Sequence, residues 1–334
     1  APKSLPPVTT LAEKLGATVL PTLQQLGFSE EEAKQAQTAD PRGVMSFVGG
    51  ETAGLARVKE YIFDNDCLKD YFDTRNGMVG KDYSTKFSSW LAIGCVSPRY
   101  IAEQCREYER VRGIKNKSTY WVIWELTVRD FFRFQSAKHG NKVFFAGGPA
   151  DVQRRWGTNK EAFGRWVSGN TGHPLVDANM RELALTGFMS NRGRQNVASF
   201  LVHNLGLDWR LGAAYFEEIL LDHDVSANWG NWNAAAGVNG GRINRFNILK
   251  QSKDYDEEGV YVKRWCPELS KVPPSRVHEP WQMNSKEMEQ YGVSVVPYTG
   301  KSTDESTVGS TYPLRMHEDN KSPPTTGGWG GGGG

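Results

Sequence analysis

The stretch Thr186–Gln195, with the sequence TGFMSNRGRQ, decides how the middle of the chain is interpreted. A first helix is predicted over Pro174–Leu185 and ends at Gly187. A second helix is predicted over Asn191–Leu205, so it begins inside the quoted stretch. Arg192 and Arg194 stand in the first turn of the second helix, where unpaired backbone N–H groups add further donors. The segment is therefore either an anion-binding helix start or a solvated capping turn.

The sequence on both sides of this stretch is predicted to be helical almost throughout, from about Leu55 to Trp281. A Ser-Pro pair begins a helix over Pro98–Arg112, and Thr119–His139 forms a long helix that a glycine ends. An aspartate caps a further helix over 208–221. Because strands do not alternate regularly with helices, a doubly wound sheet is not expected, and the predicted fold class is mainly α.

The two ends of the chain differ in composition from this helical part. Residues 1–50 are rich in Pro, Thr and Gly and are interpreted as a linker or entry segment with one short helix over Phe28–Ala36. Residues 51–283 form the predicted helical domain. Residues 284–334 are polar and end in Gly327–Gly334, so they are predicted to form a flexible tail.

The overall composition limits the class of protein. Of 334 residues 38% are apolar, and no run approaches the ~20 apolar residues of a membrane span, so a soluble protein without membrane insertion is expected. The net charge of +2 excludes the electrostatics of a histone-like binder. Four cysteines without a CxxC motif indicate reduced thiols and a reducing compartment. The chain starts at Ala1 without a signal-peptide pattern, which indicates a processed chain or a fragment.

Charged side chains recur on one face of the long helix, where Glu125, Arg129 and Arg133 are spaced by four residues. One interpretation is a salt-bridged surface stripe. The aromatic content of the other faces instead indicates a helix that is buried nearly all round. Buried charges need partners, and a polar ligand would supply them.

Acidic and hydroxyl side chains mark two further candidate sites. Asp222 and Asp224 follow an apolar helix and oppose its macrodipole, so a cation, a metal or a ligand with N–H and O–H donors would offset them. No His pair at ligand spacing accompanies them, which makes a metal the weakest option, and a solvated helix end is the alternative. Beside the Tyr83 phenol, Tyr83–Ser88 offers three aliphatic hydroxyls and an ammonium that could cradle a phosphate.

Short motifs recur in a fixed order along the helical part of the chain. They are Thr74–Gly80, Ser84–Ser88, Ser118–Trp121, Asp177–Met180, Thr186–Gln195, Leu207–Arg210 and Ala227–Trp232. In both order and spacing they resemble the photolyase/cryptochrome superfamily and, within it, the DASH cryptochromes. The resemblance covers roughly Asp40–Trp281. It implies a multi-helical FAD-binding domain, whereas the α/β antenna domain that precedes it in the family is not contained in this sequence.

The resemblance implies FAD as the cofactor and carries over its binding positions. Arg194 is expected to pair with Asp222 beside the flavin, and Asn228 to face the flavin N5. Trp232, Trp209 and Trp156 match the family's tryptophan chain and are, with Asn228, the expected catalytic residues. No metal is expected. The expected FAD-binding residues are Tyr71, Ser84, Thr85, Lys86, Phe87, Ser88, Arg129, Arg194, Asp222, Asp224 and Asn228.

The pocket that binds a flipped pyrimidine dimer in DNA-repairing relatives is only partly present. Its polar positions match Glu125, Asn191, Arg192 and Gln195. Its aromatic walls are replaced by Val128 and Ala234, and each lost stacking contact costs ~1–3 kcal/mol. The segment Gly237–Arg245 is also shortened relative to the family.

Three functions follow from the resemblance. The favoured one is a blue-light-responsive flavoprotein of the DASH type with weak or lost photolyase activity on single-stranded DNA. The alternatives are an active deoxyribodipyrimidine photo-lyase and a structural subunit that retains the flavin fold. The partner classes are single-stranded or damaged DNA and other proteins. Beyond a reducing environment the sequence does not indicate the compartment, although the resemblance allows a plastid or mitochondrion.

Overall fold

The computed structural model describes residues 22–36, 39–297 and 311–316, and divides the chain into two compact units, residues 1–41 and 42–334. The first unit contains α2 (Glu30–Ala36), two residues shorter at its start than predicted. Ser29 caps it, because its hydroxyl accepts from the Glu32 N–H and the Glu32 carboxylate accepts from the Ser29 N–H. The unit boundary lies at residue 41, nine residues before the expected boundary at residue 50.

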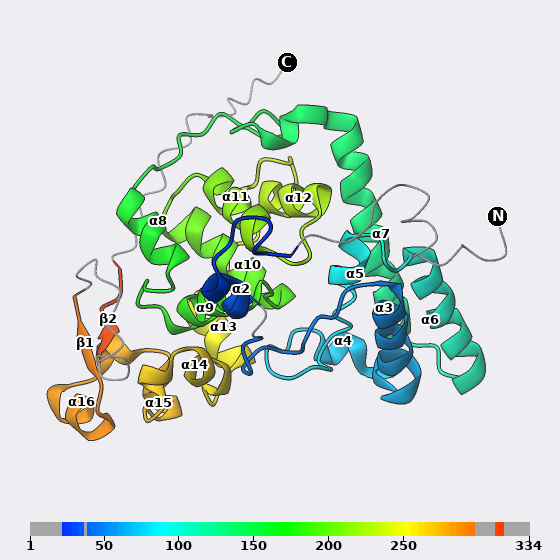
Figure 1. Ribbon diagram of the computed structural model, residues 1–334. Helices are drawn as coiled ribbons and strands as arrows, with labels where there is room; N and C mark the ends of the chain where they lie inside the picture. Colours follow the sequence, from blue (N-terminus) through cyan, green and yellow to red (C-terminus); the bar gives the residue numbers. More distant parts are fainter. Residues whose placement is uncertain (1–21, 37–38, 298–310, 317–334) are drawn as a thin grey trace, which may run out of the picture. The chain divides into compact units, whose positions relative to one another are not determined.

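The second unit is mainly α, as predicted (Figure 1). Its long helix α7 packs against α6 on one side and against α12 on another (Figure 1). In chain order the elements are α3 (Glu51–Lys59), η1 (Glu60–Asp64), η2 (Cys67–Asp70), α4 (Tyr71–Thr74), α5 (Ser88–Ala92), α6 (Pro98–Arg112), α7 (Lys117–His139), η3 (Gly140–Phe144), α8 (Lys160–Val167), α9 (Pro174–Thr186), α10 (Asn191–Ser199), η4 (Phe200–Asn204), α11 (Trp209–Ile219), α12 (Val225–Ala236), α13 (Ile248–Tyr255), α14 (Val260–Trp265), η5 (Pro267–Leu269), α15 (Pro274–Val277), η6 (Pro280–Gln282), α16 (Ser285–Tyr291), β1 (Ser294–Val296) and β2 (Thr311–Pro313).

Local capping sets several of these helix ends. Asn116 begins α7 with a capping box, and Gly140 ends it. Asp208 caps α11 through its side chain, as predicted. Ser97 stands before α6 but makes no capping hydrogen bond, so the proline that follows it is the stronger start signal there.

The prediction that α7 is buried nearly all round is wrong. Its aromatic residues at 120, 124, 131 and 134 lie at helical spacing on one face. That face is exposed, since Tyr120 retains 55%, Trp124 43%, Phe131 52% and Phe134 75% of its accessible surface. The helix buries only the opposite stripe, against α6 and α12.

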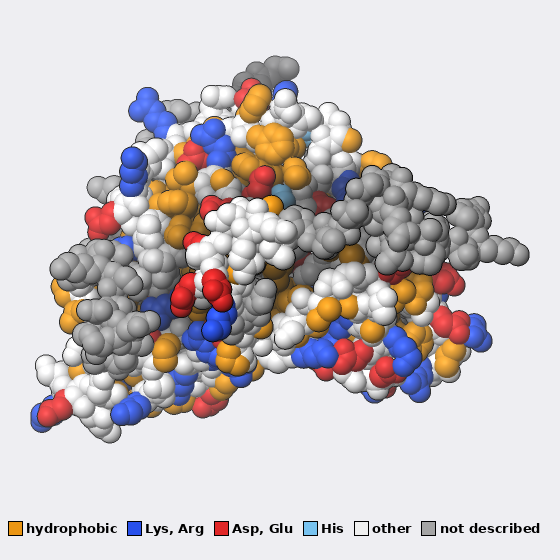
Figure 2. Space-filling view, viewed as in Figure 1, with side chains coloured by type: hydrophobic (Ala, Val, Ile, Leu, Met, Phe, Trp, Pro, Cys, Tyr) orange, Lys and Arg blue, Asp and Glu red, His pale blue; other side chains and the backbone are white. Residues whose placement is uncertain are grey.

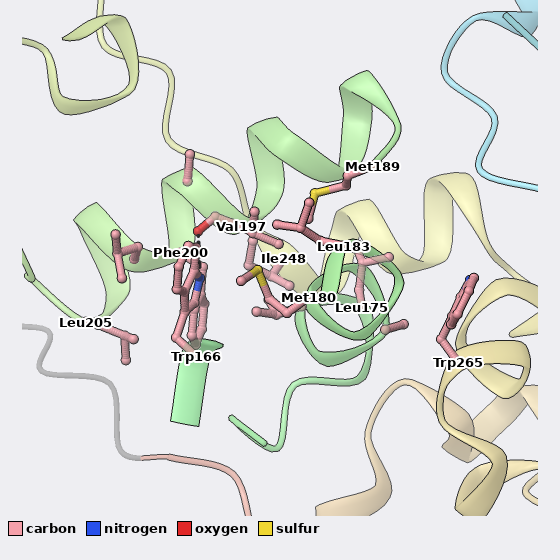
Figure 3. Close-up of a cluster of buried hydrophobic side chains, with 14 of the residues drawn as sticks. Trp166, Leu175, Met180, Leu183, Met189, Val197, Phe200, Leu205, Ile248 and Trp265 are labelled. Atoms are coloured by element: carbon pink, nitrogen blue, oxygen red, sulfur yellow. Dashed lines mark hydrogen bonds between the residues drawn. The ribbon is translucent and has the colours of Figure 1, made fainter. Parts of the chain in front are cut away.

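Two clusters of buried apolar side chains form the core. One joins α3, α4, α5, α6 and the start of α7 around residues such as Tyr61, Ile101 and Tyr108. The other lies around α9, α10 and α14 (Figure 3). In this second cluster the Trp166 indole N–H donates to the Val197 carbonyl over 3.1 Å, so a buried polar atom keeps its partner (Figure 3).

Part of the expected flexible tail is ordered. β1 and β2 form a two-stranded parallel sheet beside α16 (Figure 1). Tyr312 in β2 is fully buried, and its hydroxyl donates to the Asp177 carboxylate in α9 over 2.6 Å. An aromatic residue with a buried hydrogen-bond partner compensates for the polar composition around it. Residues 298–310 and 317–334 of the expected tail lie outside the described residues.

The surface is mixed in charge. On the face shown in Figure 2, Lys and Arg side chains alternate with Asp and Glu over the described residues. All four cysteines are free, in agreement with the expectation of reduced thiols. Across the described ranges, no helix is both long and apolar enough to cross a membrane.

Candidate functional site

A cavity of about 420 Å³ opens where the two core clusters meet. Its wall combines the loop before α5 with side chains from α10, α11 and α12. Most of the predicted site residues line it: Tyr71, Ser84, Thr85, Lys86, Phe87, Ser88, Glu125, Asn191, Arg194, Gln195, Asp222, Asp224, Asn228 and Trp232. Ala234, the expected site of a missing aromatic wall, lines it too.

Four of the predicted residues do not line the cavity. Arg129 donates to the Leu91 carbonyl over 3.2 Å, and burial lowers the pKa of its guanidinium. Arg192 is held by Asn76 and lies over the Tyr255 ring. Trp209 and Trp156 are outside the cavity lining, and both of their indole N–H groups donate to the Ala146 carbonyl.

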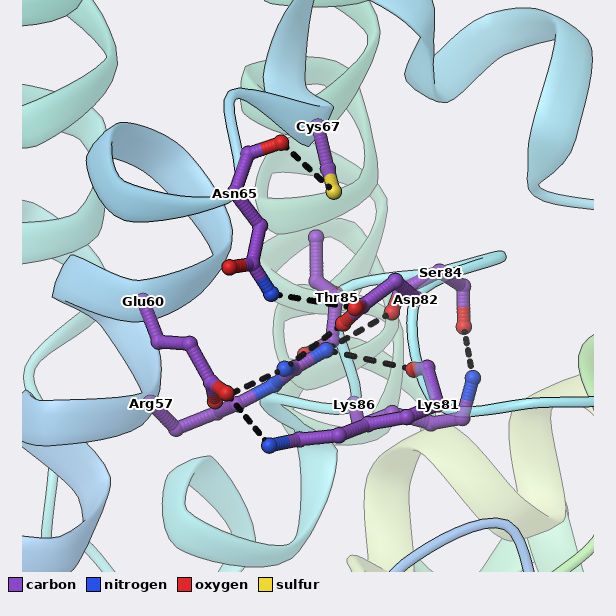
Figure 4. A network of polar contacts seen from close by, with 9 residues as sticks. All are labelled: Arg57, Glu60, Asn65, Cys67, Lys81, Asp82, Ser84, Thr85 and Lys86. Carbon is purple, nitrogen blue, oxygen red and sulfur yellow. Dashed lines mark hydrogen bonds and ion pairs between the residues drawn. The ribbon is translucent and has the colours of Figure 1, made fainter.

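The loop before α5 is shaped by Arg57, a residue that the sequence did not indicate. Arg57 is 3% exposed and donates to the backbone carbonyls of Lys81, Ser84 and Thr85 over 3.1–3.3 Å (Figure 4). It also pairs with Asp82 at 2.9 Å. One guanidinium with several acceptors therefore fixes the backbone that presents the Ser84–Ser88 hydroxyls to the cavity.

Lys86 has an unusual environment for a lysine. Its backbone is left-handed, with φ of 62°, and its side chain is buried. The ammonium lies 2.9 Å from the Ser84 hydroxyl and 3.1 Å from the centroid of the Tyr83 ring (Figure 4 shows the first contact). Burial, and then the nearby Arg57 charge, lower the pKa of Lys86 to about 6.

The expected Arg194–Asp222 ion pair is present. An Arg194 nitrogen lies 2.8 Å from Asp222 Oδ2, and the Asp222 side chain is only 2% exposed. Within the described residues, Asp222 Oδ1 is buried and accepts no hydrogen bond. The pair therefore keeps one carboxylate oxygen for a donor from a ligand.

Two polar side chains beside this pair are partly engaged with the protein. Asp224 caps α12 by accepting from the Ala227 N–H over 3.0 Å, and its other oxygen accepts from Arg133 over 2.9 Å. Burial raises the pKa of the Asp224 carboxyl. The hydrogen bonds from the Ala227 N–H and from Arg133 together outweigh burial, so the pKa lies below its ordinary value. Asn228 lines the cavity and donates an amide N–H to the Ala213 carbonyl over 3.0 Å, so its amide oxygen is left as an acceptor for a ligand.

The charged stripe on α7 does not form the predicted internal salt bridges. Glu125 pairs with Arg75 at 2.7 Å and accepts from the Trp121 indole over 3.0 Å. Arg133 pairs with Asp224 instead of a neighbour on its own helix. Arg75 and Asp224 come from other parts of the chain, whereas Trp121 lies on α7 itself, one turn before Glu125. Arg75 could have been identified from the sequence, because it belongs to the Thr74–Gly80 motif.

The donor set and the cavity wall fit an adenine dinucleotide. The Ser84–Ser88 loop supplies hydroxyls and an ammonium for a diphosphate, and Asp222 Oδ1 needs a donor such as a flavin ring N–H. Phe188, Met189 and Phe216 add apolar wall for an aromatic ring system. Among the described residues no acidic, His and Cys side chains cluster as metal ligands.

A family model described as the FAD binding domain of DNA photolyase matches residues 121–323. The chain belongs to this photolyase family of FAD-binding domains. FAD is the cofactor of the family, and the DASH-type resemblance of the sequence is confirmed by curated relatives. A Cryptochrome DASH from Gloeobacter violaceus is 54% identical over 295 residues, which cover 88% of this chain and 57% of that protein.

Two further comparisons agree with this assignment. A protein from Ostreococcus tauri named Cryptochrome DASH, chloroplastic/mitochondrial, is 55% identical over 76% of this chain and 46% of its own. The crystal structure of a Synechocystis cryptochrome has a TM-score of 0.78 and 52% identity over 84% of this chain and 56% of that one. The photolyase-type domain described here thus spans about half the length of the relatives it matches.

Proposed function

We propose that this FAD-binding domain is part of a blue-light-responsive flavoprotein of the DASH type, with weak or lost repair of single-stranded DNA. The observation that carries the proposal is that the Arg194–Asp222 pair, with its buried carboxylate, and the Ser84–Ser88 loop line one cavity. The test is the absorption spectrum of the purified protein, in which flavin bands should bleach under blue light with a thiol present. A colourless protein that does not take up added FAD would contradict it.

The roles of the lining residues follow from their free atoms. FAD, when bound, supplies light absorption and one-electron chemistry. Ser84, Thr85 and Ser88 bind its diphosphate in this proposal, with Tyr71 and Phe87 beside it. Asp222 accepts from the flavin ring edge, and Arg194 holds that carboxylate in place. Asn228 offers its amide oxygen to the cofactor, because its amide nitrogen is hydrogen-bonded to the Ala213 carbonyl.

FAD binding should take up a proton at Lys86. Without ligand the Lys86 pKa is about 6, so the side chain is neutral at about pH 8. A bound diphosphate favours the ammonium and raises this pKa, so binding weakens as pH rises, by at most about tenfold per unit. Calorimetry in two buffers of different ionisation enthalpy measures the uptake. The Lys86→Met variant should show none, and equal uptake in both proteins would contradict the assignment.

The proposed electron path leads away from the cavity through tryptophans. Trp232 lines the cavity and is 2% exposed. Its ring packs against Gly212 in α11, one turn from Trp209, where a Cβ would lie 2.2 Å from the Trp232 ring. Trp209 and Trp156 share the Ala146 carbonyl as acceptor. These contacts support a route from the flavin site through Trp232 and Trp209 toward the surface.

The DNA-binding part of the proposal rests on the cavity mouth. Glu125, Asn191 and Gln195 line the cavity, whereas Arg192 is held beside it. Glu125 already has Arg75 and the Trp121 indole as partners, so a nucleobase would compete for it. Ala234 offers no π surface, and Val128 stands outside the lining. Hydrogen bonds without aromatic stacking therefore support weak binding of a lesion. Single-stranded DNA is the preferred substrate, because flipping a base out of a single strand costs less free energy than flipping it out of a duplex.

Restoring the aromatic walls should restore lesion affinity. The Val128→Trp and Ala234→Tyr double variant is expected to bind a dimer-containing single strand more tightly, by ~1–3 kcal/mol for each wall that stacks. Affinity for undamaged DNA should change little. Gel shifts and repair assays on single-stranded and duplex oligonucleotides compare parent and variant. Efficient duplex repair by the parent would instead favour an active photolyase.

A compartment follows only by analogy. The Ostreococcus relative is named chloroplastic/mitochondrial, which supports a plastid or mitochondrion for this chain as part of the proposal. The four free cysteines of the present chain are compatible with such a reducing compartment. Fractionation of the source cells tests this directly.

A further inference from the structure

Trp209 has two tryptophan neighbours that reach the surface, and either could end an electron path. Trp209 itself is fully buried, whereas Trp156 and Trp229 are both partly exposed. The Trp229 ring lies 5.7 Å from the Trp209 ring, edge to face at 79°. Trp156 shares the Ala146 carbonyl with Trp209, at 3.1 and 3.2 Å from the two indole nitrogens. Distance alone does not choose between them.

The charges around Trp156 oppose its oxidation. The Arg154 guanidinium lies over the Trp156 ring, 4.3 Å from its centroid. Burial, and then the nearby Arg245 charge, lower the pKa of Arg154, so a second cation acts on the same region. A cation over an aromatic face is attracted to the neutral ring and repelled by a positively charged one. Removing an electron from Trp156 therefore loses an attraction and creates a repulsion.

The surroundings of Trp229 have the opposite character. Its indole N–H donates to Glu217 Oε2 over 2.7 Å. The other Glu217 oxygen lies 3.9 Å from His223 Nε2. The ring is held edge to face by Phe144 at 4.9 Å as well as by Trp209. A carboxylate at the indole nitrogen stabilises a positive ring and can also accept the proton that an oxidised indole releases.

We propose that Trp229, and not Trp156, is the surface end of the electron path, with Glu217 as its proton acceptor. One electron passes from Trp229 to oxidised Trp209, which returns to its neutral form. The Trp229 Nε1 proton then moves to the Glu217 carboxylate, leaving a neutral tryptophanyl radical and a carboxylic acid. A thiol in solution later returns an electron, and the proton goes back to Nε1.

This inference rests on the proposed light-driven function, and its first experiment uses the flavin-loaded chain. Trp229→Phe keeps an aromatic ring between Phe144 and Trp209, yet should slow photoreduction more than Trp156→Phe does. In Glu217→Gln the amide oxygen still accepts the indole N–H but cannot take the proton. Transient absorption should then show the tryptophanyl cation where the parent shows the neutral radical. A neutral radical formed at the same rate in Glu217→Gln, or a larger effect of Trp156→Phe, would overturn the proposal.

A second experiment needs no flavin, so it distinguishes failure of this inference from failure of the proposed light-driven function. Flavin-free protein is exposed to photogenerated carbonate radical, and peptide mass spectrometry gives the ratio of oxidation at Trp229 to that at Trp156. Trp229 should dominate in the parent. Arg154→Gln should move the ratio toward Trp156 by roughly two- to fivefold, the size of one exposed cation–π contact. Dominance of Trp156 in the parent overturns the inference, whereas absent photoreduction with Trp229 dominant overturns only the proposed function.

Discussion

The Asp222→Ala variant is expected to purify with little bound FAD. The substitution removes the buried oxygen that needs a ligand donor and leaves Arg194 without its 2.8 Å partner beside the cavity. Breaking a buried pair from one side costs ~3–5 kcal/mol, and each ~1.4 kcal/mol is a factor of ten in affinity. The ratio of flavin to protein absorbance after gel filtration measures the loss.

A matched variant separates loss of charge from loss of fold. Asp222→Asn keeps the side-chain volume and an amide oxygen for Arg194, so its circular dichroism and melting should stay near the parent. Its FAD affinity should still fall, between those of the parent and Asp222→Ala, because a neutral amide is a weaker acceptor. Flavin occupancy equal to the parent in both variants would remove this pair from the proposed binding site.

The helical fold could be predicted because local signals set its boundaries. Gly140 and Gly187 end α7 and α9 within one residue of the expected positions. Burial was harder to predict, since it depends on what packs against a helix. The exposed aromatic face of α7 has the composition of a buried one, and only the positions of α6 and α12 reveal the difference. Tyr312 shows the reverse, because a buried anchor lies within a polar sequence.

The candidate site was predictable where short motifs carry it. Ser84–Ser88 and the Arg194–Asp222 pair could be named through the family resemblance, and the structure brings them into one cavity. Arg57 could not be named from the sequence, because it donates to backbone carbonyls that lie more than twenty residues away along the chain. The Glu125–Arg75 pair spans fifty residues, so spacing along one helix predicted the wrong partner. Contacts between distant segments are the part that sequence spacing does not contain.

The Trp232→Phe variant is expected to keep FAD but to lose steady-state photoreduction. Trp232 is the only member of the proposed path that lines the cavity, and a phenylalanine ring is much harder to oxidise than an indole. Bleaching under blue light with a thiol should slow at least about tenfold, which needs only ~1.4 kcal/mol of added barrier. The ring still fills most of the space against Phe216, so the fold and the cofactor should remain.

Trp166→Phe is the matched control for this result. Trp166 is also buried, and its ring lies 6.3 Å from that of Trp232, but it does not line the cavity. Trp166→Phe makes a similar packing loss, and it also loses the 3.1 Å hydrogen bond to the Val197 carbonyl. It does not interrupt the path toward Trp209, so its bleaching rate should stay near the parent. Equal slowing in both variants would mean that packing around the flavin controls the rate. Unchanged bleaching in Trp232→Phe would mean that electrons reach the flavin without Trp232, and that the path proposed here is not used.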